Sequence, residues 1–150
     1  GSSFVVTPGG DANGDGLDVS LSTIFVKDSG FDGQPDKGIS VGERSQVFVW
    51  KNTFKGNGNG IAVKDRSDVW LADNSFSENT RDVAVYRKKA IFGGGHVYLT
   101  DAASRTLVTE LDELSSRHLY DPAGARSLLT GEPVTELGPL FAALRQGGQP

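Results

Sequence analysis

The chain has no cysteine and only two histidines among its 150 residues. The lack of cysteine excludes a disulfide framework, a thiolate metal site and a cysteine nucleophile, and it leaves the redox compartment open. No apolar run approaches the roughly 18 residues of a membrane span, so we expect no membrane insertion. The formal net charge of -4 disfavours general binding to nucleic acid. His96 and His118 are far apart in the sequence, and we expect each to be a structural histidine.

Glycine is abundant, and its placement indicates many tight turns. The chain has 20 glycines, most of them before residue 96. Four apolar strand starts recur at residues 16–19, 38–41, 60–63 and 82–85, so the period is 22 residues. A period of that length is typical of a solenoid, whose units bury their apolar sides against one another.

Each repeat contains further short strands, which predicts about three strands per coil. The segment 46–50 alternates in polarity, and this alternation places Val47 and Val49 on one face and Phe48 and Trp50 on the other. We therefore expect a right-handed parallel β-helix of about four coils over residues 11–100. The predicted inward positions are Leu17, Val19, Ile24, Val26, Phe31, Ile39, Val41, Val47, Val49, Phe54, Ile61, Val63, Val69, Leu71 and Phe76.

Two further columns follow from this register. Asn52 and Asn74 are expected to form an asparagine ladder that satisfies backbone groups at a corner. Outward aromatic residues are expected to form a second column, which consists of Phe25, Phe48 and Trp70 and continues to Phe92 or Tyr98. Such a column can bind sugar rings or accept the leucine-rich C-terminal segment, and we favour the second interpretation.

The remaining segments flank the solenoid. Residues 1–10 lack the pattern of a signal peptide and are expected to hold an expression scar and the end of a preceding coil, as in a C-terminal fragment. Leucines at residues 107, 111, 114 and 119 recur at helical spacing, and so do the apolar residues of 137–144. We predict a helical C-terminal cap or tail over residues 101–150. The acidic residues at 110, 112 and 113 disfavour a helix on a membrane surface.

The segments 13–18, 36–43, 60–65 and 86–89 carry a resemblance to a known family. They resemble the bacterial right-handed β-helix repeat proteins of pectin-lyase-like fold, which are often joined to CotH-type or lamin-tail domains. The resemblance covers about residues 10–100 and implies the fold more strongly than any activity. Polygalacturonase-type hydrolases share this fold, and their motif aspartates match Asp15 and Asp36. Lys37 stands where that family has a second aspartate, and residues 57–60 lack its histidine.

Charged residues recur at the same period and form candidate sites. The columns begin with Asp15 above Lys37, Asp18 above Ser40, and Glu43 above Asp65. A lysine or arginine near carboxylates can act as the base in β-elimination or epimerisation of a uronic acid. The candidate catalytic residues are Asp15, Asp36, Lys37 and Arg87. The candidate ligand-binding residues are Asp18, Glu43, Lys64, Asp65, Arg66 and Trp70. A plain solvated face with ion pairs between coils is the alternative, and it is favoured over catalysis.

The opening residues of the first coil also fit a calcium loop. Asp11, Asn13 and Asp15 alternate as they do at the start of such loops, although Ser22 stands where the loop needs a bidentate acid. A corner of the β-helix is the default interpretation. No other cofactor is expected.

The function predicted from the sequence is a secreted or cell-envelope domain that binds polysaccharide, with uronate lyase or epimerase activity as an extension of that role. A noncatalytic structural or adhesive module is the alternative. In that case the N-terminal edge of the solenoid would pair with further strands or with another chain.

Overall fold

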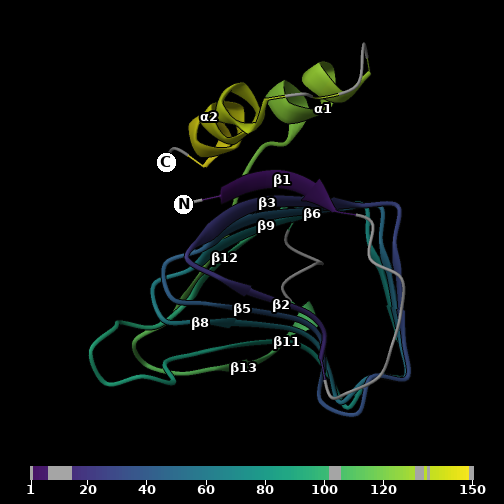
Figure 1. Ribbon diagram of the computed structural model, residues 1–150, viewed down its shortest axis with the longest axis vertical. Helices are drawn as coiled ribbons and strands as arrows, with labels where there is room; N and C mark the ends of the chain where they lie inside the picture. The colour runs from purple at the N-terminus through teal and green to yellow at the C-terminus, as the bar shows by residue number, and fades with distance from the viewer. Residues whose placement is uncertain (1, 7–14, 102–105, 131–133, 135, 149–150) are drawn as a thin grey trace.

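The computed structural model describes residues 2–6, 15–101, 106–130, 134 and 136–148. The chain winds into a three-sided solenoid, and two helices lie along one side of it (Figure 1). All strand pairs are parallel, which confirms the predicted parallel β-helix. None of these described helices is both long and apolar enough to cross a membrane.

Each side of the solenoid is one sheet. The six-stranded sheet has the order β1 (Ser2–Val6), β3 (Ser22–Lys27), β6 (Gln46–Trp50), β9 (Asp68–Ala72), β12 (His96–Leu99) and β14 (Ser116–Leu119). The five-stranded sheet has the order β13 (Val108–Leu111), β11 (Arg81–Tyr86), β8 (Asn59–Lys64), β5 (Lys37–Gly42) and β2 (Asp15–Ser20). The three-stranded sheet has the order β10 (Ser75–Ser77), β7 (Thr53–Lys55) and β4 (Gly30–Asp32).

The core consists of the inward positions that the repeat predicts. All fifteen predicted residues belong to one apolar cluster, and Leu17 and Phe76 are the two that are only partly buried. The rings of Phe31, Phe54 and Phe76 stack along the solenoid, with centroids 5.0 and 4.8 Å apart. Val83, Val85, Val97 and Leu99 extend the same core into the following coil.

The repeated glycine is needed because the backbone of the next coil lies too close for a side chain. A Cβ atom added to Gly38 would lie 2.6 Å from the carbonyl oxygen of Gly60 and 3.0 Å from the ring of Phe54. One added to Gly60 would lie 2.5 Å from the carbonyl oxygen of Asp82. The 22-residue period of glycine therefore records the close approach of adjacent coils beside the phenylalanine stack.

Two asparagine ladders satisfy backbone groups at the corners. The predicted ladder is present, since Asn52 Oδ1 accepts from the Ser29 amide at 2.9 Å and Asn74 Oδ1 accepts from the Asn52 amide at 2.9 Å. A second ladder, which sequence analysis missed, repeats this geometry with Asn57 and Asn79 at the next corner. These side chains replace backbone hydrogen bonds where the chain leaves a strand.

The segment after residue 101 differs from the prediction. The leucines between 107 and 119 were expected in a helix, but this stretch forms β13 and β14, which pair with β11 and β12 and lengthen the solenoid. Helical spacing was misleading here because Leu111, Leu114 and Leu119 are exposed and are not one buried face. The helices α1 (Ala123–Leu129) and α2 (Leu137–Gly147) come later.

The two helices cover a side of the solenoid and not its end (Figure 1). Their apolar residues join Phe25, Phe48 and Trp70 in a second buried cluster. Phe141 meets the Trp70 ring edge to face at 5.7 Å, and Tyr98 stacks on Trp70 at 4.8 Å. Docking of the C-terminal segment on the aromatic column is therefore confirmed, with Tyr98 as its continuation.

Replacement of Phe54 by alanine should lower the free energy of unfolding by about 3–5 kcal/mol, because the ring is fully buried between two others. Urea denaturation measures the change. Thr53→Ala, on the exposed side of the same strand, is the matched control and should shift it by no more than about 0.5 kcal/mol. A loss below about 1 kcal/mol in Phe54→Ala would contradict the stacked core.

Candidate functional site

The candidate site lies at one corner of the solenoid, where the five-stranded sheet turns into the six-stranded sheet. Two successive coils make this corner with Glu43 and Arg44, and with Asp65 and Arg66. All four have positive φ angles, between 53° and 60°. The backbone therefore takes the left-handed conformation twice in a row in each coil, which costs about 1–3 kcal/mol per residue for side chains other than glycine.

The next coil departs from the repeat at this same corner. Strand β11 ends at Tyr86 and β12 begins at His96, and the intervening residues form a longer loop that projects from the solenoid (Figure 1). Lys88 and Lys89 lie in this loop, and with the first three coils they line a polar hollow of about 130 Å³. Its lining comprises Asp18, Val19, Ser20, Gly42, Glu43, Lys64, Asp65, Lys88 and Lys89.

The Asp65 carboxylate fastens this loop to the solenoid. Its Oδ1 atom accepts hydrogen bonds from the backbone amides of Lys88 and Lys89, at 2.7 and 2.9 Å. The residue is 1 % exposed. Asp65 was predicted to bind ligand, but the contacts of its Oδ1 atom give it a structural role in shaping the hollow.

Glu43 forms the rim of the hollow. Its carboxylate accepts from the Ser20 hydroxyl at 2.8 Å and forms an ion pair with the Lys89 ammonium. The Lys89 ammonium and the Ser20 hydroxyl lower the pKa of Glu43, and the carboxylate in turn raises the pKa of Lys89. Because the folded pKa of Glu43 lies below its ordinary value, this contact contributes stability above about pH 4.5 and is lost as the pH falls through the folded pKa.

Lys64 lies deeper in the hollow. The residue is only 7 % exposed, and its ammonium donates to the Ser40 hydroxyl at 2.8 Å. Beside it on the outer face of the sheet are the small residues Ala62 and Ala84, in register with Ser40. The predicted stacking of Asp18 above Ser40 is confirmed, and Asp18 is exposed.

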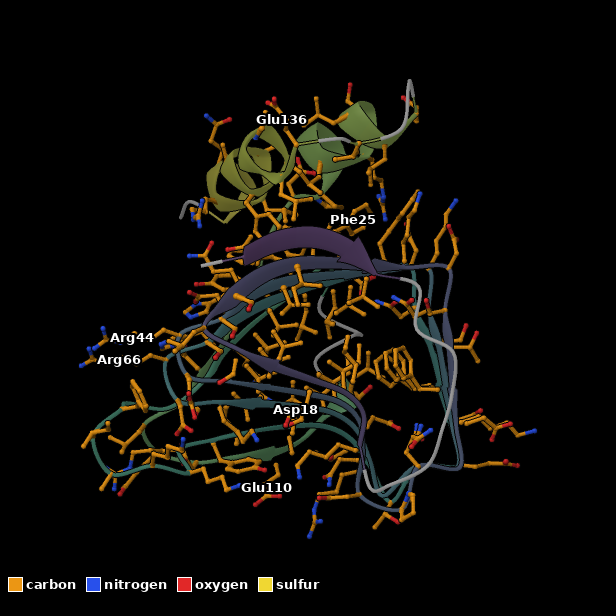
Figure 2. All side chains as sticks on the ribbon, viewed as in Figure 1. Asp18, Phe25, Arg44, Arg66, Glu110 and Glu136 are labelled. Carbon is orange, nitrogen blue, oxygen red and sulfur yellow. The ribbon has the colours of Figure 1, made fainter. Side chains whose placement is uncertain are left out.

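The arginines of the corner are placed differently from its carboxylates. Arg44 and Arg66 are both exposed, and Figure 2 shows both side chains pointing away from the solenoid. The Arg44 guanidinium lies 5.5 Å from the centroid of the Phe92 ring in the long loop. Phe92 lies in this loop and not in β12, so Tyr98 and not Phe92 continues the aromatic column. The carboxylates hold the corner together while the guanidinium groups face the solvent.

Three of the predicted catalytic residues, Asp15, Asp36 and Lys37, lie together at the start of β2 and β5, and Arg87 lies apart from them. Asp36 and Lys37 form an ion pair of 2.6 Å at the start of β5. Lys37 and Gly42 are the two ends of that strand, so the pair lies roughly 16 Å from the hollow. The backbone amide of Arg87 donates to Asp112 at 2.8 Å, and the exposed side chain of Arg87 belongs to the long loop. Asp15 is in register with Lys37.

Two other predictions have different outcomes. Trp70 was predicted to bind ligand, but it is 2 % exposed beneath Phe141 and cannot stack on a sugar from solution. Asp11 and Asn13, and the side chain of Asp15, lie outside the described residues, so the calcium prediction is untested. Within the described ranges, no three histidine or acidic side chains are grouped as a metal site would require.

The comparisons with known proteins bear on the fold. Residues 9–110 match a family model described as a right handed beta helix region. The search of curated proteins gave no match, and neither did the search of solved structures.

Asp65→Gly should release the long loop, because it removes the acceptor of two amides while glycine tolerates the positive φ angle. Loss of charge-assisted hydrogen bonds worth about 1.5–3 kcal/mol should speed tryptic cleavage after Lys88 and Lys89 at least about tenfold. Mass spectrometry of a digestion time course measures it. Asp65→Asn keeps an uncharged acceptor and should be cleaved at a rate between those of the wild type and Asp65→Gly. Equal rates in all three proteins would contradict the anchoring role.

Proposed function

Because the chain belongs to the right-handed β-helix family, we propose that its solenoid is a polysaccharide-binding module that takes an anionic glycan at the corner of Arg44 and Arg66. The observation that carries the proposal is the pair of exposed guanidinium groups on successive coils. Such groups bind carboxylate and sulfate in a bidentate manner. Uronate or sulfated sugars carry these anions.

The spacing of the coils suits a repeating ligand. Adjacent strands of a sheet lie about 4.8 Å apart, which is close to the length of one pyranose unit in an extended glycan. The amide of Arg44 donates to the carbonyl of Asp65 at 2.9 Å, so the two turns are in direct contact. A glycan that follows the solenoid axis would therefore meet one guanidinium per coil, and then the cations of the long loop.

The polar hollow at this corner supplies groups that suit a sugar. Its lining includes the Ser20 hydroxyl, the Lys64 ammonium and the Glu43 carboxylate, which can form hydrogen bonds with sugar hydroxyls. The positive φ angles of Arg44 and Arg66 are a general property of the described corners, since Leu21, Asp28, Lys51, Asp73 and Glu78 have them too.

The geometry at Lys37 favours binding over elimination. The Lys37 ammonium is paired with the Asp36 carboxylate at 2.6 Å, and its side chain is only 12 % exposed, so it is poorly placed to reach a substrate proton. We therefore do not place lyase or epimerase chemistry at this pair. Ultraviolet absorbance of an unsaturated uronate product, with Lys37→Ala as control, tests this choice. A secreted or cell-envelope location is part of the proposal, since such glycans are found there.

A structural or adhesive module is the second candidate. The strands β2 and β4 end their sheets in the described part of the chain. Open edges of this kind can pair with another strand. Concentration-dependent self-association in sedimentation experiments, combined with no binding to any acidic glycan, would favour this candidate.

The double variant Arg44→Gln/Arg66→Gln should weaken binding of a uronate polymer at least about tenfold, because each charge-assisted contact contributes about 1.5–3 kcal/mol. Titration calorimetry against polygalacturonate, alginate and a sulfated glycan measures the affinity. Binding should also fall with added salt.

Lys51→Gln/Lys55→Gln is the matched control. It removes the same charge elsewhere on the solenoid, where Lys51 lies at the next corner, Lys55 ends β7, and both are exposed. The proposal is wrong if the two double variants lose affinity equally, or if the wild-type chain binds none of the three polymers.

A further inference from the structure

A row of polar side chains starts the later strands of the six-stranded sheet, directly after the corner from which the long loop projects. The register places Gln46 beside Asp68, Asp68 beside His96, and His96 beside Ser116. Two residues further along, Trp70, Tyr98 and His118 are in register on the same outward face. The two histidines, which were expected to be separate, thus lie on adjacent strands.

Ser116 lies between the two imidazoles. Its Oγ atom is 2.5 Å from His96 Nδ1 and 2.7 Å from His118 Nε2. A serine hydroxyl has one hydrogen, so it can donate to only one of these nitrogens. The other nitrogen must then donate its own hydrogen to Oγ. One imidazole is therefore placed to remove the serine proton, and the other to stabilise negative charge as it forms.

Charged and titratable groups surround this trio on every packed element. Asp68 of β9 stands beside His96, Tyr98 of β12 stacks on His118 at 5.1 Å, and Arg145 of α2 donates to Gln46. The Tyr98 hydroxyl donates to Asp68 at 3.3 Å. Burial raises the pKa of Asp68, and burial with the Asp68 charge raises the pKa of Tyr98 to about 12.

We propose that Ser116 is a nucleophile for acyl transfer from small carboxylic esters, with His96 as its base, His118 as the second hydrogen-bond donor and Asp68 as a positioning residue. His96 is assigned as the base because it is the imidazole in register with a carboxylate, that of Asp68. The Asp68 carboxylate favours the imidazolium that His96 becomes. The site is accessible, because Ser116 is half-buried and His118 is exposed. This inference is independent of glycan binding at the arginine corner.

The reaction balances without a cofactor. Ser116 Oγ bonds to the ester carbonyl carbon as its proton moves to His96 Nδ1, and His118 Nε2–H donates to the oxygen that gains charge. The carbon–alkoxide bond then breaks, and His96 returns the proton to the departing alcohol. Water then attacks the acyl carbon as its proton moves to His96, the bond from that carbon to Ser116 Oγ breaks to release the carboxylic acid, and His96 returns the proton to Ser116 Oγ. The sum is ester plus water giving acid plus alcohol.

The test treats the full chain with a fluorophosphonate probe, in which serine oxygen displaces fluoride from phosphorus. Peptide mapping by mass spectrometry should find the adduct on Ser116 in the wild type. Ser115→Ala is the matched control. Its hydroxyl donates to Asp112 at 2.6 Å and does not contact either histidine, so labelling should persist. Ser116→Ala should lose the adduct while its circular dichroism stays unchanged.

Hydrolysis of p-nitrophenyl acetate supplies the second readout. The acylation rate should fall at least about tenfold in His96→Gln, a loss typical of removing a general base. In Asp68→Asn the acylation rate should fall while the KM for the ester stays the same, because a base that is no longer held in place slows the chemical step and not ester binding; a merely structural role would not separate the two. No adduct on the folded wild-type chain, or an adduct on a residue other than Ser116, would overturn the proposal.

Discussion

The structure depends on one constraint, which is that equivalent residues of successive coils lie directly above one another in parallel register. Parallel pairing places Ile39 over Ile61 and Val41 over Val63, so a side chain that suits one coil must also suit the next. Stacking makes each apolar column a continuous core, which no single coil could provide. Because of the same constraint, an asparagine that recurs in successive coils forms a ladder of hydrogen bonds. A glycine that recurs leaves space for the backbone of the next coil. The constraint also explains why polar side chains in this chain occur in rows.

The chain departs from its repeat at the long loop after β11, and this departure creates a surface feature that a regular solenoid does not have. A regular solenoid presents the same corner in each coil, and a corner of stacked turns is convex. The long loop after β11 breaks this pattern and folds its two lysines toward the preceding coils, where Asp65 holds its backbone. A polar hollow arises between the regular corner and the irregular loop. The proposed binding site therefore lies where the long loop interrupts the repeat, beside a corner that is held in place by the neighbouring coils.

The sequence predicted the interior better than the surface, and physical reasons explain the difference. Inward positions such as Val47 and Phe54 must be apolar in every coil, so their period is visible in the sequence. The helix predicted from the leucines of 107–119 was wrong. Their spacing is helical, but the open edges of β11 and β12 were available for strand pairing, and this could not be read from the spacing. The position of the long loop was visible as a break in the period, but its folding onto Asp65 depends on backbone amides, which every residue has. The proximity of His96 and His118 depends on the register of β14 with β12, and the 22-residue repeat did not predict β14.

The outward aromatic column shows that one sequence pattern fits two functions, sugar binding and helix docking, that exclude each other. Stacked rings on an outer sheet face are suited to sugars, and they are equally suited to the apolar side of a helix. Phe25, Phe48 and Trp70 are nearly or fully buried because Leu140, Phe141 and Leu144 lie over them. Burial of these side chains gives about 1.5–3 kcal/mol each, which is more than a rim of sugar contacts would return to an exposed ring. A face stabilised in this way is withdrawn from ligand binding, so a ligand must use another surface of the solenoid, such as the corner where Arg44 and Arg66 are exposed.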